Sequence, residues 1–333
     1  MDPLTQGVLG AALPQTMQRN SQVGIAGALG LIAGMAADLD VLIRSTTDPL
    51  LFLEYHRQFT HALIFIPVGG LICAMALYWI LGRRRGLSFA QTYLFCTLGY
   101  ATHALLDTCT SYGTMLYWPF SNERLSWSII SIVDPLFTIP VLVLVVLAGL
   151  RQKPVLSRVA LAWAVIYLTT GALQHEAALA MASKIATSRG HTPMRVEVKP
   201  SFGNILVWKT IYETPDRFYV DAVRTGVRPR IFSGVSLPKL VSTRDLAWLD
   251  PASQQARDIA RFTWFSQGFV AEDPKHPNRI IDIRYSLLPN TVSALWSIEL
   301  EPSAAPKAHA RYQTHREDAR ESLGTLWRMV SGD

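Results

Sequence analysis

Charged residues are scarce in this 333-residue chain. They make up 17% of the sequence, against about 25% in typical soluble domains. Half of the residues are hydrophobic, and the mean hydropathy is +0.21. This balance predicts a membrane protein, and the length leaves room for two structural units.

Cysteines and several well-known motifs are also missing or few. The three cysteines, all in the apolar half, form no CxxC pair, so neither a disulfide framework nor a cysteine zinc site is expected. GxSxG, Walker A and HExxH motifs are absent, which leaves serine-nucleophile and nucleotide-driven chemistry without support. The net charge of +6 forms no basic stripe with interleaved aromatics, so no nucleic-acid partner is expected. The start, MDPLTQG, lacks the basic n-region of a cleavable signal peptide.

Apolar segments dominate the first 182 residues. A bilayer needs about 20 residues of helix, and residues 3–14 are too short to cross alone at about 1.5 Å per residue. The candidate membrane segments are residues 22–37, 61–81, 89–107, 129–150 and 156–182. We therefore expect a polytopic α-helical membrane domain over residues 1–182, with four to five membrane segments.

Basic residues between these segments predict an orientation. Arg19 lies in the first turn, Arg83–Arg85 follow the segment 61–81, and a third group comprises Arg151, Lys153 and Arg158. With this number of spans all three groups fall on one side, which the positive-inside rule assigns to the cytoplasm. The acidic residues and histidines at the other segment ends, and the C-terminal half, would then be periplasmic.

The C-terminal half changes character near residue 190. Stretches such as RVEVKP, RFYVDAVRT and SALWSIEL alternate in hydrophobicity and are rich in β-branched and aromatic residues. Glu213–Asp216 is typical of a turn between two strands, whereas residues 238–262 and 314–330 favour helix. We expect a soluble α+β domain, mostly antiparallel, over residues 190–333.

The stretch Ala101–Thr114 carries the strongest site signal. His103 and Asp107 are four residues apart, so both project from one helical face at the end of an apolar segment. Ionisable residues in such a place indicate a functional site. Imidazole with carboxylate suits zinc, iron or manganese. The alternative is a hydrogen-bonded pair that orients the helix end.

Acids and histidines recur upstream. His56 and His61 are five apart, a spacing that does not align on an ideal helix, and Arg57 beside them can bind a phosphate or carboxylate through its planar guanidinium. Asp38 and Asp40 end an apolar helix, where acids oppose the helix dipole, and both carboxylates could reach one site. The alternatives are ordinary interfacial capping and helix termination.

Other polar residues have more ordinary explanations. Asp2 followed by Pro3 is a common helix start. Asp134 precedes a proline and is either a helix cap or a buried site carboxylate. His175 and Glu176 are expected to be polar residues buried between helices rather than ligands.

These motifs, in this order, resemble the YdjM-type family of bacterial inner-membrane proteins, predicted to be metal-dependent hydrolases. The resemblance covers roughly residues 1–140. It rests on MDPLTQGVLGAAL, ADLDV, HRQFTHAL and GYATHALLDTCTSYGTMLYWPFS.

The resemblance implies metal-linked roles for seven residues: Asp2, Asp38, Asp40, His56, His61, His103 and Asp107. The family usually has Thr-His near its start. This chain keeps that dipeptide at Thr60–His61 and Thr102–His103 but has Thr5–Gln6. Since an amide oxygen binds zinc far more weakly than imidazole, we expect one metal position to be empty, water-filled or altered.

Our leading hypothesis is a membrane-bound metal-dependent hydrolase of the inner membrane. A divalent metal, zinc before manganese or iron, would be held by Asp38, His61, His103 and Asp107, with Asp40 and His56 in a second metal position or in the outer shell. Asp40 would act as general base, and Arg57 would hold a phosphate or carboxylate. A site at the bilayer face favours a lipid or phosphoester substrate. The alternative is a non-catalytic scaffold with a structural metal or polar network and a partner-binding C-terminal domain.

Overall fold

The computed structural model describes residues 1–18, 21–315 and 319–332. The chain divides into two compact units. The first unit comprises Met1–Leu42, Tyr55–Leu173 and Phe202–Asn204, and the second comprises Ile43–Glu54, Gln174–Ser201 and Ile205–Asp333. The long helix α7 (Pro154–Ser188) contributes to both units.

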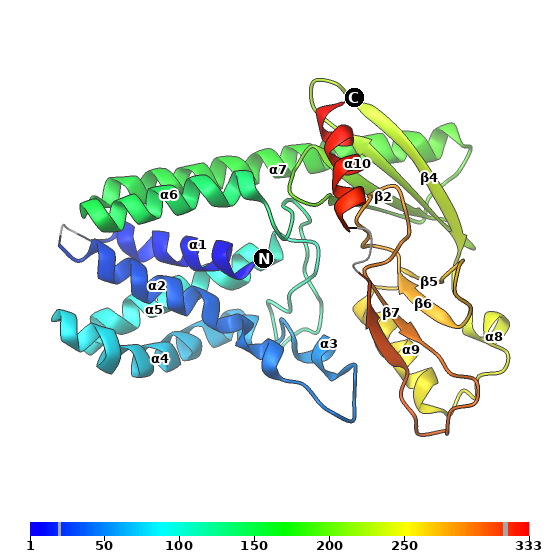
Figure 1. Cartoon of the computed structure of the whole chain (residues 1–333), viewed down its shortest axis with the longest axis horizontal. Helices are drawn as coiled ribbons and strands as arrows, with labels where there is room; N and C mark the ends of the chain where they lie inside the picture. Colours follow the sequence, from blue (N-terminus) through cyan, green and yellow to red (C-terminus); the bar gives the residue numbers. More distant parts are fainter. Residues whose placement is uncertain (19–20, 316–318, 333) are drawn as a thin grey trace. The chain divides into compact units, whose positions relative to one another are not determined.

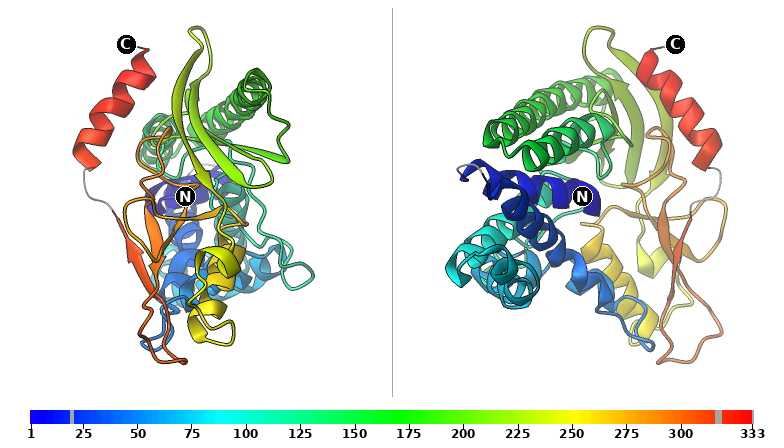
Figure 2. Two further views of the ribbon diagram at one scale, coloured as in Figure 1. Left: turned by 90° about the vertical axis from the view of Figure 1, so that its right-hand side faces the viewer. Right: turned by 60° about the vertical axis from the view of Figure 1, so that its left-hand side comes forward.

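The first unit is a helical bundle (Figure 1). Its longer helices run along a common direction, and α6 and α7 lie side by side (Figure 2). Besides α7, the α-helices are α1 (Pro3–Thr16), α2 (Val23–Ala36), α4 (Ile66–Leu77), α5 (Phe89–Thr108) and α6 (Pro135–Arg151). Shorter helical turns are η1 (Ala37–Leu42), η2 (Phe59–His61), η3 (Leu63–Phe65), the π-turn η4 (Tyr78–Gly82) and η5 (Arg83–Arg85).

Local signals place the helix starts. Asp2 caps α1, its carboxylate accepting the Thr5 backbone N–H, and Pro3 follows at the first helical position. Ser88 and Gln91 form a reciprocal capping box at the start of α5. Asp134 caps α6 in the same way and also accepts the Tyr167 hydroxyl. Of the two explanations open for Asp134, the structure shows the cap.

Small residues let three helices approach closely. A side-chain carbon at Gly30 of α2 would lie 2.3 Å from the Gly10 carbonyl oxygen of α1, and one at Gly99 of α5 would lie 2.3 Å from the Gly30 carbonyl oxygen. Such distances leave room only for glycine. Close backbone packing of this kind is typical of helices in membranes.

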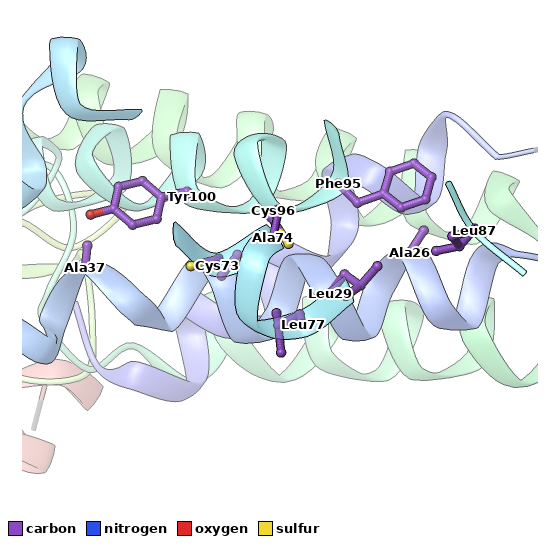
Figure 3. Close-up of a cluster of buried hydrophobic side chains, with 11 residues drawn as sticks. Ala26, Leu29, Ala37, Cys73, Ala74, Leu77, Leu87, Phe95, Cys96 and Tyr100 are labelled. Carbon is purple, nitrogen blue, oxygen red and sulfur yellow. The ribbon is translucent and has the colours of Figure 1, made fainter. Parts of the chain in front are cut away.

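An apolar core joins α2, α4 and α5. The close-up in Figure 3 labels Leu29, Cys73, Phe95 and Tyr100 among the buried side chains of this cluster. The three cysteines of the chain are unpaired and buried. Cys73 and Cys96 therefore act here as small apolar core residues.

Among the described residues, three helical stretches are long and apolar enough to cross a membrane: Val23–Leu42, Leu63–Arg85 and Pro154–Ser188. The helix α6 is apolar but shorter. The segment expected at residues 89–107 forms helix α5, which is not one of these three stretches.

The second unit contains two four-stranded antiparallel sheets. The first sheet has the order β1 (Arg195–Pro200), β2 (Val207–Glu213), β3 (Arg217–Arg224) and β4 (Arg230–Pro238). The second has the order β5 (Val270–Glu272), β6 (Arg279–Asp282), β7 (Trp296–Glu299) and β8 (Arg311–Thr314). Its helices are α3 (Leu51–Tyr55), α8 (Ser242–Asp245), α9 (Gln254–Phe265) and α10 (Ala319–Ser331).

The strands confirm the expected mixed fold, with some differences in detail. The turn expected at Glu213–Asp216 connects β2 and β3. Within residues 238–262 only α8 and the start of α9 are helical, because Pro251 and its flanking turn interrupt the helix-favouring pattern. Strand β4 does not alternate between buried and exposed residues. Most of its residues are exposed or half-buried.

Candidate metal centre

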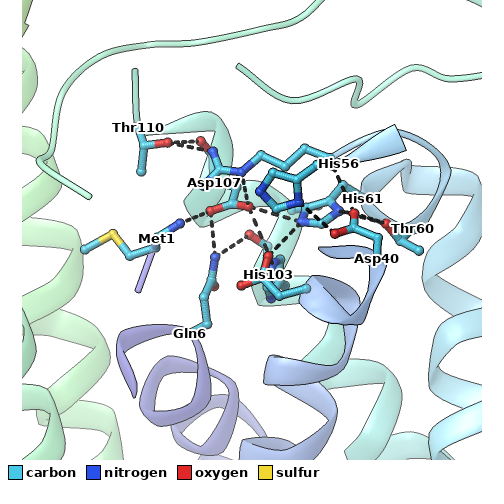
Figure 4. A network of polar contacts seen from close by, with 12 residues as sticks. Met1, Gln6, Asp40, His56, Thr60, His61, His103, Asp107 and Thr110 are labelled. Atoms are coloured by element: carbon cyan, nitrogen blue, oxygen red, sulfur yellow. Dashed lines mark hydrogen bonds and ion pairs between the residues drawn. The ribbon is translucent and has the colours of Figure 1, made fainter. Parts of the chain in front are cut away.

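Four side chains converge at one end of the first unit. Asp38 comes from η1, His61 from η2, and His103 and Asp107 from successive turns of α5. One ligand atom from each lies within 4.8 Å of all the others. His61, His103 and Asp107 are fully buried, whereas the Asp38 side chain is 19% exposed. We call these four residues the His/Asp cluster (Figure 4).

The separations within the His/Asp cluster suit a tetrahedral metal. His61 Nε2 lies 3.2 Å from Asp107 Oδ2 and 3.6 Å from Asp38 Oδ1. His103 Nε2 lies 3.5 Å and 3.3 Å from the same two atoms. Ligands 2.0–2.1 Å from a zinc ion at the centre of a tetrahedron would be about 3.3–3.4 Å apart. These four edges match that spacing.

Hydrogen bonds on the far side of each ring fix its tautomer. His103 Nδ1 is 2.6 Å from the Gly34 carbonyl oxygen, which can only accept, so Nδ1 carries the proton. The Thr60 hydroxyl donates to Asp40 and therefore accepts from His61 Nδ1 at 2.9 Å. Both Nε2 atoms consequently point their lone pairs into the cluster. Orientation of this kind is typical of metal-binding histidines.

The converging atoms lack hydrogen bonds of their own. His61 Nε2, His103 Nε2 and Asp107 Oδ2 are buried and make no hydrogen bond within the described residues. Imidazole nitrogens buried against carboxylate oxygens need a cation between them, either a proton on the ring or a metal ion. The donor set, its spacing and its burial therefore fit a divalent metal ion.

Asp107 is the most heavily contacted carboxylate of the cluster. Arg57 Nε lies 3.0 Å from Asp107 Oδ2, and Gln6 Nε2 donates to Oδ1 at 2.8 Å. The Met1 amino group also contacts Oδ1. Gln6 Oε1 is buried and makes no hydrogen bond within the described residues. Gln6, where the resemblance expects histidine, thus lies directly beside the cluster.

Asp40 and His56 form a second group with Asp38. His56 Nδ1 is 2.7 Å from Asp40 Oδ1, while Asp40 Oδ2 accepts from the Arg57 backbone and the Thr60 hydroxyl. Burial lowers the pKa of His56 below its ordinary value. A neutral His56 can bind metal. The hydrogen bonds of Asp40 are compatible with a metal ligand, and they fit equally well a carboxylate that orients His61.

Arg57 lies within a strained turn beside the cluster. Its φ of 62° is in the left-handed region, which a non-glycine residue adopts at a cost. Its guanidinium lies 4.8 Å from the centre of the Tyr112 ring, and that of Arg124 lies 5.6 Å from the same centre. The sequence motifs identify Arg57 but give no signal for Arg124, whose role depends on contacts made only in the fold.

Residues 1–178 match the family described as YdjM inner membrane protein. The chain belongs to this family. A curated relative by sequence, the inner membrane protein YbcI of Escherichia coli (strain K12), is 34% identical over 110 residues. The aligned region covers 31% of this chain and 60% of YbcI. No solved structure matches the chain.

The family match confirms the resemblance and extends it beyond residue 140. The names of the family and of YbcI, together with the apolar helices, make this YdjM-family chain an inner membrane protein.

Two other residues considered from the sequence lie elsewhere. Asp2, with its carboxylate at the start of α1, is in neither group of candidate ligands among the described residues. His175 is 3.3 Å from Glu176, and its ring contacts Trp208. The expectation that both are buried between helices is wrong for Glu176, whose side chain is 73% exposed.

Basic residues mark the opposite end of the YdjM-family helical bundle. The η5 turn, with Arg83–Arg85, and the connection between α6 and α7, with Lys153, lie at the end away from the His/Asp cluster (Figure 1). Arg158 donates to the Thr16 carbonyl, so the end of α1 is there too. Arg19 lies outside the described residues.

Proposed function

We propose that this protein is a membrane-bound, metal-dependent hydrolase. The observation that carries the proposal is the convergence of two oriented imidazoles and two carboxylates, in which both Nε2 atoms and Asp107 Oδ2 make no hydrogen bond among the described residues. In a metal-bound site these same atoms would all face the ion, which accounts for their convergence.

Asp38, His61, His103 and Asp107 would hold the metal. A nitrogen and oxygen donor set without thiolate suits zinc and also admits manganese or iron. A divalent ion here supplies Lewis acidity and lowers the pKa of water to near neutrality.

The surrounding residues would orient ligands and substrate. Through Thr60, Asp40 holds His61 in the tautomer that ligates metal. Arg57 neutralises Asp107 and, with Arg124 on the same Tyr112 ring, places positive charge where an anionic substrate group would lie. This favours a phosphoester, and the location in a membrane favours a lipid substrate. A general-base role for Asp40 stays a prediction.

A two-metal centre is compatible with the same geometry. Asp38 belongs to both groups of candidate ligands, and the second group adds Asp40 and His56. Carboxylates that bridge two ions are a common feature of hydrolytic centres. Asp38 would be the bridging residue.

We propose that the bundle crosses the membrane four to five times. The 20 residues of α5 span about 30 Å, enough for the hydrocarbon core, so α5 and α6 would add to the three apolar helices. The basic end would face the cytoplasm. The His/Asp cluster and the C-terminal domain over residues 190–333 would be periplasmic. An alkaline-phosphatase fusion after Asp333 would then be active, and an inactive fusion would reverse the orientation.

A structural metal site is the second candidate function. Four protein ligands can close a tetrahedral zinc site completely, whereas catalytic sites keep a position open. In that case the C-terminal domain would serve to bind a partner in the envelope. The exposed edge of Asp38 favours the catalytic alternative, because it gives the cluster a route to solvent.

The deciding experiment measures metal content and hydrolysis in detergent-purified protein. The native chain is compared with His103→Ala and Asp107→Asn, with the exposed His276→Ala as the control. We expect stoichiometric metal and hydrolysis of a phosphoester or phospholipid only in the native chain and the control. Metal without hydrolysis of any tested ester would favour the structural alternative, and absence of metal after reconstitution would overturn both.

A further inference from the structure

The second unit contains a cavity of about 570 Å³, and no residue of the His/Asp cluster lines it. This volume lies within the range of about 300–1,000 Å³ common for small-molecule sites. Its walls come from the β5–β6 turn, from β6 and the loop that follows it, and from the end of β8. All of these segments belong to the second unit.

One part of the cavity wall is basic. Lys275, His276, Arg279 and His315 line it, while Asp273 is the one acid among its described lining residues. The Asp273 carboxylate already accepts the Lys275 backbone N–H and lies 3.3 Å from His276 Nδ1. The described lining residues of the cavity therefore carry an excess of positive charge.

Arg279 is the least satisfied of these basic residues. Its side chain is only 15% exposed, and its nearest carboxylates, Asp273 and Glu299, are 3.6 Å and 3.9 Å away. Its Nε is buried and makes no hydrogen bond within the described residues. The Arg279 Nε is thus left without an acceptor within the described residues, and carboxylates or phosphates match guanidinium geometry best.

Another part of the cavity wall is apolar. Leu287, Leu288 and Val292 line it beside Ile281 and Ala294, which belong to the hydrophobic core of the second unit. A free inorganic anion would leave these side chains facing water. A ligand with an apolar body would cover them and gain from the burial.

We propose that this cavity binds an amphipathic anion, with its carboxylate or phosphate head on Arg279 and its apolar chain against Leu287, Leu288 and Val292. Lys275 adds positive charge near the head group. Lys209 supports the wall from behind by donating to the Thr291 carbonyl oxygen. The site involves no residue of the His/Asp cluster, so it stands independently of the proposed hydrolase.

Short-chain probes test the proposal on the full-length protein in lipid nanodiscs by isothermal titration calorimetry. Octanoate and octyl phosphate carry the two head groups, and octanol carries the chain without charge. The variants are Arg279→Met and the cavity-filling Val292→Trp, with the exposed Arg311→Met on β8 as the matched control. Asp107→Asn tests independence from the metal centre.

We expect both anions to bind to the native chain, Arg311→Met and Asp107→Asn. Arg279→Met should weaken the binding of both anions by at least about tenfold, the factor for one charge-assisted hydrogen bond, and leave octanol unchanged. Val292→Trp should abolish binding of all three. Equal anion affinities in the native chain and Arg279→Met would overturn the proposal, as would binding that survives Val292→Trp. A preference between the two anions identifies the head group.

Discussion

His61 Nε2 lies 3.2 Å from Asp107 Oδ2, yet no hydrogen bond joins the two atoms. The Thr60 hydroxyl accepts from His61 Nδ1, so His61 Nε2 faces the carboxylate in a buried place. A proton or a metal ion between the two atoms explains this arrangement, and the predictions about the metal centre follow from a metal ion in this position.

Removing a ligand should abolish metal binding. In Asp107→Asn the cluster loses a charged oxygen donor, and the neutral amide that replaces it binds zinc poorly. We expect the metal content, measured by mass spectrometry, to fall from stoichiometric to background. His276→Ala should retain full occupancy, since His276 is exposed and belongs to neither ligand group of the described residues. Equal metal in native and Asp107→Asn protein would contradict the assignment.

Substitution of Asp40 can distinguish a role in orienting His61 from a role as a metal ligand. If it only orients His61 through Thr60, Asp40→Asn should weaken metal affinity by about 10–100-fold without changing stoichiometry. If Asp40 instead belongs to a second metal position, the number of bound ions should fall. Competition with a chromophoric chelator measures both quantities in one titration, and Thr60→Val provides the matched variant, since it breaks the same link to His61.

Gln6 offers a gain-of-function test. Its Nε2 is 2.8 Å from Asp107 Oδ1, and its Oε1 makes no hydrogen bond within the described residues. Gln6→His places an imidazole next to the cluster and should tighten zinc binding, because nitrogen is a better zinc ligand than an amide oxygen. Gln6→Ala is the control. Zinc affinity that is the same in the native chain and Gln6→His would show that position 6 takes no part in metal binding.

The glycine contact between α1 and α2 should be intolerant of any side chain. A methyl group at Gly30 would lie 2.3 Å from the Gly10 carbonyl oxygen, so Gly30→Ala must push the helices apart. We expect a loss of about 1–3 kcal/mol, the usual cost of overpacking, seen as a lower thermal midpoint in detergent. Gly324→Ala in α10 is the matched control, because nothing lies within 4 Å of its added carbon. A thermal midpoint of Gly30→Ala at or above that of native protein would contradict the close packing of α1 and α2.

Lys199 should make the stability depend on pH. Burial lowers the pKa of Lys199 to about 8, despite Glu197 at 3.8 Å, and lowers that of Lys209, directly across the strand pair, to about 7. Asp282 nearby is already paired with Arg284. In an unfolded chain these lysines titrate near 10.4. Between about pH 7 and 10 the unfolded state therefore binds more protons, so stability rises with pH.

The variant Lys199→Met removes one of these lysines without breaking a hydrogen bond of its ammonium group. We expect a higher thermal midpoint than that of native protein at pH 7, with the difference shrinking as the pH approaches 10. Lys307→Met, at an exposed position, should behave like native protein at both pH values. A constant difference between Lys199→Met and native protein across this range would contradict a lowered pKa.

The sequence predicted the helical, apolar first half and the β-rich second half, because hydrophobic periodicity depends only on the local chain. It also identified His103 and Asp107 as a pair, since four residues in a helix put two side chains on one face. Helix starts at Asp2, Ser88 and Asp134 follow from capping chemistry that is equally local.

Tertiary structure alone decided how the other ligands meet. Asp38 lies next to α5 because glycine contacts bring α1, α2 and α5 together. His61 reaches the same place through the η2 turn, which no sequence periodicity predicts. The tautomers of both histidines depend on Gly34 and Thr60, and the basic cavity around Arg279 depends on the antiparallel register of β6, β7 and β8. Such contacts join residues distant in the chain, so their chemistry exists only once the backbone is folded.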